Sequence, residues 1–101
     1  MASSREMLDR LWRWKKSSTV LKLTLLTKNE EPEGFIGEIT GISEEFMQVG
    51  FCGRKKQETL SLDLRGAKFV LGKTTLEAIR SAEVRLLLEE LRVDKIHTPV
   101  Q

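Results

Sequence analysis

Two groups of residues could in principle carry catalytic or ligand chemistry, and each lacks a partner that the chemistry requires. Gly72-Lys73-Thr74 looks like the end of a phosphate-binding loop, in which backbone amides and a lysine hold a phosphate. The glycine required five residues earlier is Ala67, and Gly66 stands one position too early. Cys52 and His97 would have to approach from a strand and a tail, and they are too few for a metal cluster. We therefore expect no enzyme activity, no cofactor and no metal.

The composition is that of a small soluble domain. A chain of 101 residues that is 40% hydrophobic and 32% charged fits one domain with one core. No apolar run approaches the roughly 20 residues that a spanning helix needs, and the N-terminus lacks the apolar stretch of a signal peptide. A single cysteine excludes an internal disulfide. These features predict one cytoplasmic domain over residues 1–101, with no membrane partner.

Charge is distributed in blocks along the chain. Residues 1–28 carry seven Lys or Arg and two acids, residues 29–50 carry six Glu and no base, and residues 51–75 carry six bases and two acids. Basic blocks on both sides of an acidic one are compatible with nucleic-acid contact, and equally with the solvated faces of an ordinary domain. The net charge of +2 does not decide between these interpretations.

A change of hydrophobic phase marks a turn at Arg65-Gly66. Strand side chains alternate between two faces, so a slip of one residue moves the apolar set to the opposite face. Glycine is the residue best suited to such a turn. The apolar positions are even before the turn and odd after it: Leu60, Leu62 and Leu64, then Ala67, Phe69 and Leu71. The sequence therefore predicts two consecutive strands joined at this dipeptide.

Residues 1–17 predict a short basic amphipathic helix. Ser3 and Glu6 have the spacing of a capping box, and apolar residues follow at helical intervals among arginines and lysines. Such a helix could cover one end of the core, or it could bind a membrane surface or a nucleic acid.

The rest of the chain predicts a barrel followed by a second helix. Residues 18–72 contain five short segments with a period of two, and Gly37 and Gly41 favour strong bending, so we expect a small five-stranded open barrel. Residues 73–95 begin with a second capping-box pattern and are rich in Leu and Ala, which predicts a C-terminal helix. Its apolar arc is too wide for one contact, so it would also meet a second surface. Residues 96–101 would form a tail.

The order of these elements, with Arg-Gly between the last two strands, resembles the Sm-like (LSm) family of RNA-binding proteins. Residues 64–71 match in type that family's second motif, Ile-Arg-Gly-x-x-Ile-x-x, at the turn from its fourth to its fifth strand. Gly37 and residues 44–51 are similar to the first motif, a glycine followed by Asp-x-aromatic-or-His-Met-Asn. Here Glu44 takes the place of the Asp, or Ser43 does if the loop is one residue longer. Gln48 takes the place of the Asn, which keeps the amide but moves it by one methylene.

The resemblance implies a site for single-stranded RNA rich in U or A. In the family, a base stacks between the aromatic or His of the first motif and the arginine of the second, while the amide reads the base edge. Those positions are Phe46, Arg65 and Gln48 here. The complete expected set is Phe46, Gln48, Arg65, Gly66 and Glu44 for RNA binding, with Arg10, Arg13 and Lys68 as candidate phosphate contacts.

The resemblance also implies a ring. Family subunits join head to tail, the fourth strand of one pairing with the fifth of the next, and residues 58–64 and 68–71 would take those roles in a cyclic homo-oligomer of about five to eight subunits. Two other interpretations stay open. Phe46 and Arg65 could be a core-rim residue and a turn residue paired with a carboxylate. The chain could also be an Sm-fold scaffold that binds protein through its C-terminal helix and no RNA, because acids beside a base pocket repel phosphate.

Overall fold

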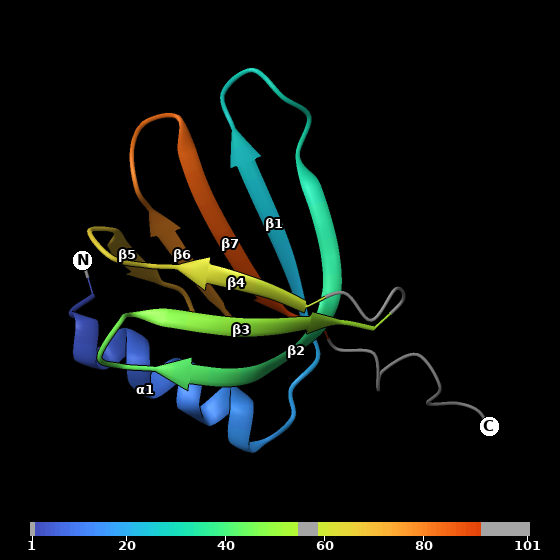
Figure 1. The fold of residues 1–101 in the computed structure, drawn as a ribbon, viewed down its shortest axis with the longest axis vertical. Helices are drawn as coiled ribbons and strands as arrows, with labels where there is room; N and C mark the ends of the chain where they lie inside the picture. Colours follow the sequence, from blue (N-terminus) through green and yellow to red (C-terminus); the bar gives the residue numbers. More distant parts are fainter. Residues whose placement is uncertain (1, 55–58, 92–101) are drawn as a thin grey trace.

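The structure, a computed structural model, describes residues 2–54 and 59–91 as one helix and a single antiparallel sheet (Figure 1). The sheet has seven strands in the order β4-β3-β2-β1-β7-β6-β5. The elements are α1 (Ser4–Lys16), β1 (Leu21–Thr27), β2 (Glu33–Ser43), β3 (Gln48–Gly53), β4 (Thr59–Asp63), β5 (Lys68–Leu71), β6 (Thr75–Ile79) and β7 (Val84–Glu90). Because β4 and β5 end the strand order, each is paired with another strand on one side only.

The N-terminal helix forms as the sequence predicts. The Ser3 side chain accepts from the Glu6 backbone N–H and the Glu6 carboxylate accepts from the Ser3 N–H, which is the capping box. Basic side chains occupy the last turn, where their positive charges interact favourably with the negative end of the helix dipole. Within residues 2–54 and 59–91, no helix is long and apolar enough to cross a membrane.

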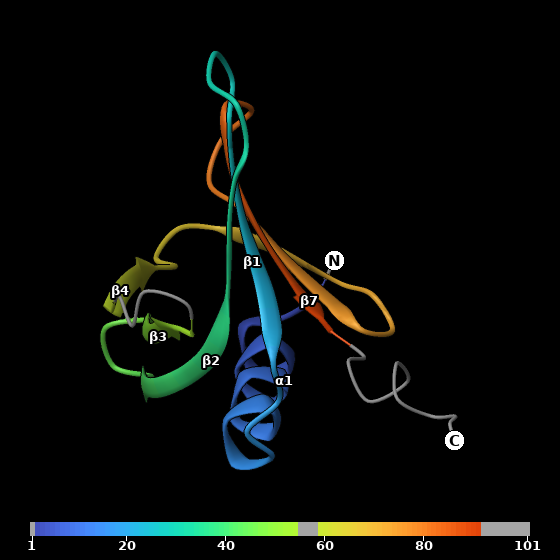
Figure 2. The same cartoon turned by 90° about the vertical axis from the view of Figure 1, so that its right-hand side faces the viewer.

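The sheet is bent along β2 into two walls, which meet above α1 (Figure 2). The first half of β2, Glu33–Gly37, pairs with β1, and the second half, Gly37–Ser43, pairs with β3. We call β4, β3 and the second half of β2 the first wall, and the first half of β2 with β1, β7, β6 and β5 the second wall. Gly37 pairs with both neighbours, and a register shift follows between Ile39 and Gly41. The bend therefore lies where the glycines are.

The core fills the angle between the two walls and the helix. Leu23 on β1, Phe51 on β3 and Leu88 on β7 are almost wholly buried, and they alternate with exposed or half-exposed residues on the same strands. The buried apolar residues are Met7, Leu8, Leu11, Trp14, Leu21, Leu23, Ile39, Val49, Phe51, Leu62, Leu64, Phe69, Leu76, Ala78 and Leu88. One core thus joins every element of the described chain.

The prediction of a five-stranded barrel followed by a helix is correct for the position of the five strands, and wrong for the number of strands and for the helix. All five predicted strands are present as β1 to β5, but residues 73–91 form β6, a turn and β7, so the sheet has seven strands and there is no C-terminal helix among the described residues. The remainder of the predicted helix, 92–95, and the predicted tail, 96–101, lie outside the described residues.

The β6–β7 hairpin explains why residues 73–95 show such a wide apolar arc when they are placed on a helix. Leu76 and Ala78 on β6, and Leu86 and Leu88 on β7, face the core at intervals of two, and on a helical projection such a pattern spreads around the circumference. Glu, Ala, Leu and Arg favour helix locally, but pairing with β1 and β5 overrides that weak preference.

We expect Gly37→Ala to destabilise the protein by about 1 to 3 kcal/mol, the usual range for overpacking. A Cβ at Gly37 would collide with the carbonyl group of Cys52 and lie 2.9 Å from the Cα of Gly53, and all of these are backbone atoms with little freedom to move. Gly41→Ala is the matched control, because a Cβ there meets nothing within 4 Å. Urea unfolding of both variants measures the difference. Equal stability of the two variants would contradict the close-approach role of Gly37.

Candidate nucleic-acid interface

The two turns that carry the expected RNA-binding residues lie side by side. The turn from β2 to β3 contains Phe46, and the turn from β4 to β5 contains Arg65. The Leu64 N–H donates to the Met47 carbonyl at 2.9 Å, which ties the second turn to the first. The β3–β4 pairing therefore brings the two turns together.

The β2–β3 turn presents an exposed aromatic ring. Phe46 is 54% exposed, and its backbone N–H donates to the Ser43 hydroxyl at 3.3 Å. Met47 has a φ of 50°, in the left-handed region that non-glycine residues seldom adopt. Gln48 begins β3 and is paired with Asp63 across the ladder. Because Val49 and Leu62 point into the core, Gln48 and Asp63 share the outer face of the first wall.

Asp63 holds Arg65 in a fixed position in the β4–β5 turn. The Arg65 Nε and Nη2 donate to the two carboxylate oxygens, each at 3.1 Å, and the Arg65 backbone N–H donates to the same carboxylate at 3.1 Å. Gly66 follows with a φ of 76°, a conformation that suits glycine. The guanidinium plane is thus oriented by its edge, and an edge contact leaves the faces of a guanidinium usable for stacking.

This pairing also changes the acidity of both groups. The side-chain hydrogen bond from Arg65, then its backbone N–H and, as smaller contributions, the positive charges of Arg65 and Arg80 together lower the pKa of Asp63 from 3.8 to about 2. The hydrogen bond to Asp63 raises the pKa of Arg65 above its ordinary value. Arg65 therefore has its positive charge largely matched by a carboxylate, as one of the alternative interpretations of the sequence expects. We call Phe46, Gln48, Asp63 and Arg65 the turn cluster.

Glu44 points away from the turn cluster toward the helix. The Trp12 Nε1–H donates to its Oε2 at 2.6 Å, and the Arg5 guanidinium lies 3.3 and 3.4 Å from its two oxygens. The hydrogen bond from Trp12, and then that from Arg5, lower the pKa of Glu44. Its negative charge is thus engaged by α1.

The three candidate phosphate contacts lie in different surroundings. Arg10 is half-buried, and its Nη1 and Nη2 donate to the carbonyls of Thr75 and Gly72, each at 3.0 Å. It therefore joins α1 to the β5–β6 turn. Arg13 is exposed on α1, and Lys68 is exposed at the start of β5. Of the three, Arg13 and Lys68 are the side chains open to a phosphate.

An apolar cleft of about 310 Å³ lies between β4 and the second wall. Asp63 on β4 and Arg80 after β6 stand on its two sides, and Val84, which lines it, is 44% exposed. The lining residues are Leu25, Ser61, Leu62, Asp63, Leu64, Ala78, Arg80, Val84 and Leu86. The free edge of β4 therefore borders an open apolar surface.

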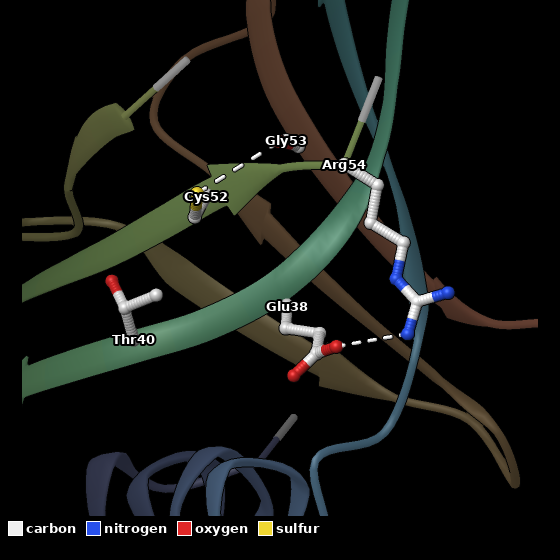
Figure 3. Close-up of a pocket in the computed structure, with 5 residues that line it drawn as sticks. All are labelled: Glu38, Thr40, Cys52, Gly53 and Arg54. Carbon is white, nitrogen blue, oxygen red and sulfur yellow. Dashed lines mark hydrogen bonds and ion pairs between the residues drawn. The ribbon is translucent and has the colours of Figure 1, made fainter. Parts of the chain in front are cut away.

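A second hollow, of about 320 Å³, lies on β2 and β3 away from the turn cluster (Figure 3). Glu38, Thr40, Cys52, Gly53 and Arg54 line it. The Arg54 Nη2 pairs with the Glu38 carboxylate at 3.0 Å, so the two charged groups that line the hollow are partners of each other. Across the described ranges, no three His, Cys, Asp or Glu gather as metal ligands.

Comparison with known proteins does not assign the chain to a family. No protein-family model matches the chain, and no curated protein or solved structure matches it either.

Sequence reasoning named Phe46, Gln48, Arg65 and Gly66 but missed the residues that orient them. Asp63 stands two positions before Arg65, a spacing that suits a turn carboxylate and could have been recognised. Trp12 and Arg5 are more than 30 positions from Glu44, and no local pattern indicates that contact.

The Asp63–Arg65 pair should make stability depend on acid pH. The folded-state pKa of Asp63, about 2, lies below the ordinary 3.8, so the pair stabilises the fold above pH 3.8 and loses that effect as the pH falls toward 2. We expect Asp63→Asn to be less stable than the wild type at pH 5, with a difference that shrinks toward pH 2. Denaturant unfolding across this range measures it.

An Arg65→Gln background supplies the control for this prediction. There the pH-dependent effect of Asp63→Asn should become smaller, because the guanidinium is gone and only the residue-65 backbone N–H and Arg80 still lower the pKa of Asp63. A wild-type advantage that stays constant from pH 5 to pH 2 would contradict the assignment.

Proposed function

We propose that this chain is an Sm-like module that binds single-stranded RNA by stacking a base between Phe46 and Arg65. The observation that carries the proposal is the Leu64–Met47 backbone hydrogen bond, which joins the turns bearing these two residues. An aromatic ring and a guanidinium plane on adjacent turns are a sequence-tolerant platform for an unstacked base. Gln48, on the same outer face as Asp63, has the amide that could hydrogen-bond a base edge.

The electrostatics of the turn cluster suit a neutral base better than a phosphate. Asp63 matches the charge of Arg65, and α1 matches that of Glu44, so both of these carboxylates already have partners within the protein. The objection that acids repel RNA is weaker for carboxylates that already have cationic or N–H partners. Exposed basic side chains such as those of Arg13 and Lys68 would supply the phosphate contacts.

The strand order supports head-to-tail assembly as part of this function. β4 and β5 are the two ends of the sheet, and pairing one with the other joins unlike edges, which closes into a ring or runs on as a fibre. We propose a closed homo-oligomer of about five to eight subunits. One acceptor of the β5 edge is already used, because the Ala2 N–H donates to the Phe69 carbonyl at 2.9 Å. The pairing would therefore centre on Leu71, whose backbone groups face the same side.

We expect Phe46→Ala and Arg65→Ala each to weaken oligo(U) binding roughly 5- to 150-fold, since base stacking contributes about 1 to 3 kcal/mol. Fluorescence anisotropy with labelled oligonucleotide measures the affinity. Ile36→Ala and Arg54→Ala are the matched controls, because they remove an exposed apolar group and an ion-paired arginine at the far end of β2 and β3. Wild-type affinity in both turn variants would contradict the assignment of the base site to Phe46 and Arg65.

Assembly can be tested with proline on β4. The Leu64 N–H faces β3, so by alternation the Ser61 N–H faces the free edge and the Leu60 N–H faces β3. We expect Ser61→Pro to lower the oligomer mass in light scattering while the subunit stays folded, because the lost donor lies on the free edge.

Leu60→Pro is the internal comparison for this test. Its proline removes a donor from the β3–β4 ladder, so it should destabilise the subunit itself. A wild-type protein that is a monodisperse monomer at micromolar concentration would refute the ring.

A scaffold that binds protein and no RNA is the second candidate, and the apolar cleft beside β4 favours it. An extended segment of a partner could add to the free edge of β4 while its side chains enter the cleft. The C-terminal helix expected to bind such a partner is not formed by residues 73–91, which make the β6–β7 hairpin instead. A salt-dependent shift of labelled oligo(U) on a native gel distinguishes the two candidates: the RNA-binding module shifts it and the scaffold does not.

A further inference from the structure

We propose that Trp12 and Arg5 on α1 are positioning residues for the base site. By binding Glu44 they hold the β2–β3 turn in place, and the turn keeps Phe46 in the position from which it can stack on a base together with Arg65. This inference rests on the proposed function and extends it from the turn cluster to the helix.

Of the residues between β2 and β3, only Met47, at the end that enters β3, packs against the core. Glu44, Glu45 and Phe46 are all exposed, and Met47 occupies the left-handed region of backbone space. An exposed turn with few buried contacts opens readily unless bonds to a rigid element hold it. The Phe46 N–H bond to Ser43 is local to the turn. The bond from Leu64 to Met47 fixes only the end of the turn that enters β3.

Glu44 supplies the bonds that fix the other end. One of its carboxylate oxygens accepts from both Trp12 and Arg5, at 2.6 and 3.3 Å, and the other accepts from Arg5 at 3.4 Å. Arg5 is itself braced by Asp9, one helical turn away, at 3.1 Å. Both oxygens of Glu44 are therefore occupied by the helix, and its part in the site is to hold the turn rather than to touch a base.

The helix is a rigid base for this connection. Met7, Leu11 and Trp14 are buried on its opposite side, and Trp14 also donates to the Glu90 carboxylate at 2.8 Å. A turn that is already ordered before binding loses less conformational freedom when the base arrives. Loosening the connection should therefore weaken binding without removing any atom that touches RNA.

Trp12→Phe tests the inference because it removes the Nε1–H and keeps an aromatic ring at a position that is 39% exposed. In the free protein, we expect the backbone amides of residues 45–48 to exchange faster with solvent. With labelled oligo(U), we expect an affinity on the order of three- to tenfold weaker. Lys15→Gln is the matched control for exchange, since it removes the cation 5.9 Å from the Trp12 ring and leaves the bond to Glu44.

A double-mutant cycle separates positioning from general destabilisation. If Trp12 acts through the turn, Trp12→Phe should have no further effect on affinity in a Phe46→Ala background. An undiminished effect in that background would overturn the positioning role, as would unchanged affinity in the single variant.

The two measurements also separate this inference from the proposed function. Unchanged amide exchange in Trp12→Phe would overturn the connection whether or not the protein binds RNA. Failure of the wild-type protein to bind oligo(U), with faster exchange in the variant, would overturn the RNA function and the positioning role while leaving the connection between α1 and the turn in place.

Discussion

Burial of the apolar side of α1 in the angle between the two walls is the interaction on which the rest of the structure depends. Met7 and Leu11 are fully buried there and Trp14 almost so, and side chains of this size each contribute about 2 kcal/mol when removed from water. The helix contacts β2 and β5, and Arg10 ties it to the β5–β6 turn. Without it the bent sheet would expose the apolar faces of both walls. The polar side of the same helix carries the residues that reach Glu44, so one element organises both the core and the candidate site.

The sequence predicted the elements whose patterns are local and failed where pairing between distant segments decides. The capping box at Ser3 and the alternation in β1 to β5 are local signals, and they were sufficient. Residues 76–88 have residue types that favour helix and a spacing compatible with strands, and only their pairing with β1 selects the hairpin. The site divides in the same way. Phe46 and Arg65 could be named from motif resemblance, whereas the contact between Trp12 and Glu44 depends on how the finished helix lies against the sheet.

The paired carboxylates bear on how the candidate site would discriminate among ligands. With Asp63 matching Arg65 and α1 matching Glu44, the turn cluster offers surfaces and hydrogen-bonding groups more than it offers net positive charge. Binding that depends on stacking is less sensitive to salt than binding that depends on phosphate contacts. Specificity would then come from the shape and edge of a base, and attraction over longer distances from separate basic residues on α1 and β5.

The strand order has a consequence for how the chain acquires its structure. β1 to β4 form one meander of neighbouring strands, and β5 to β7 form another. The meanders join through the pairing of β1 with β7, in which Leu21 lies opposite Glu90 almost seventy residues later. Closing so large a loop is slow compared with forming hairpins. During synthesis, β1 must therefore wait with one edge unpaired until nearly the whole described chain has emerged, and in that interval its leucine-rich strand is the segment most open to pairing with the wrong partner.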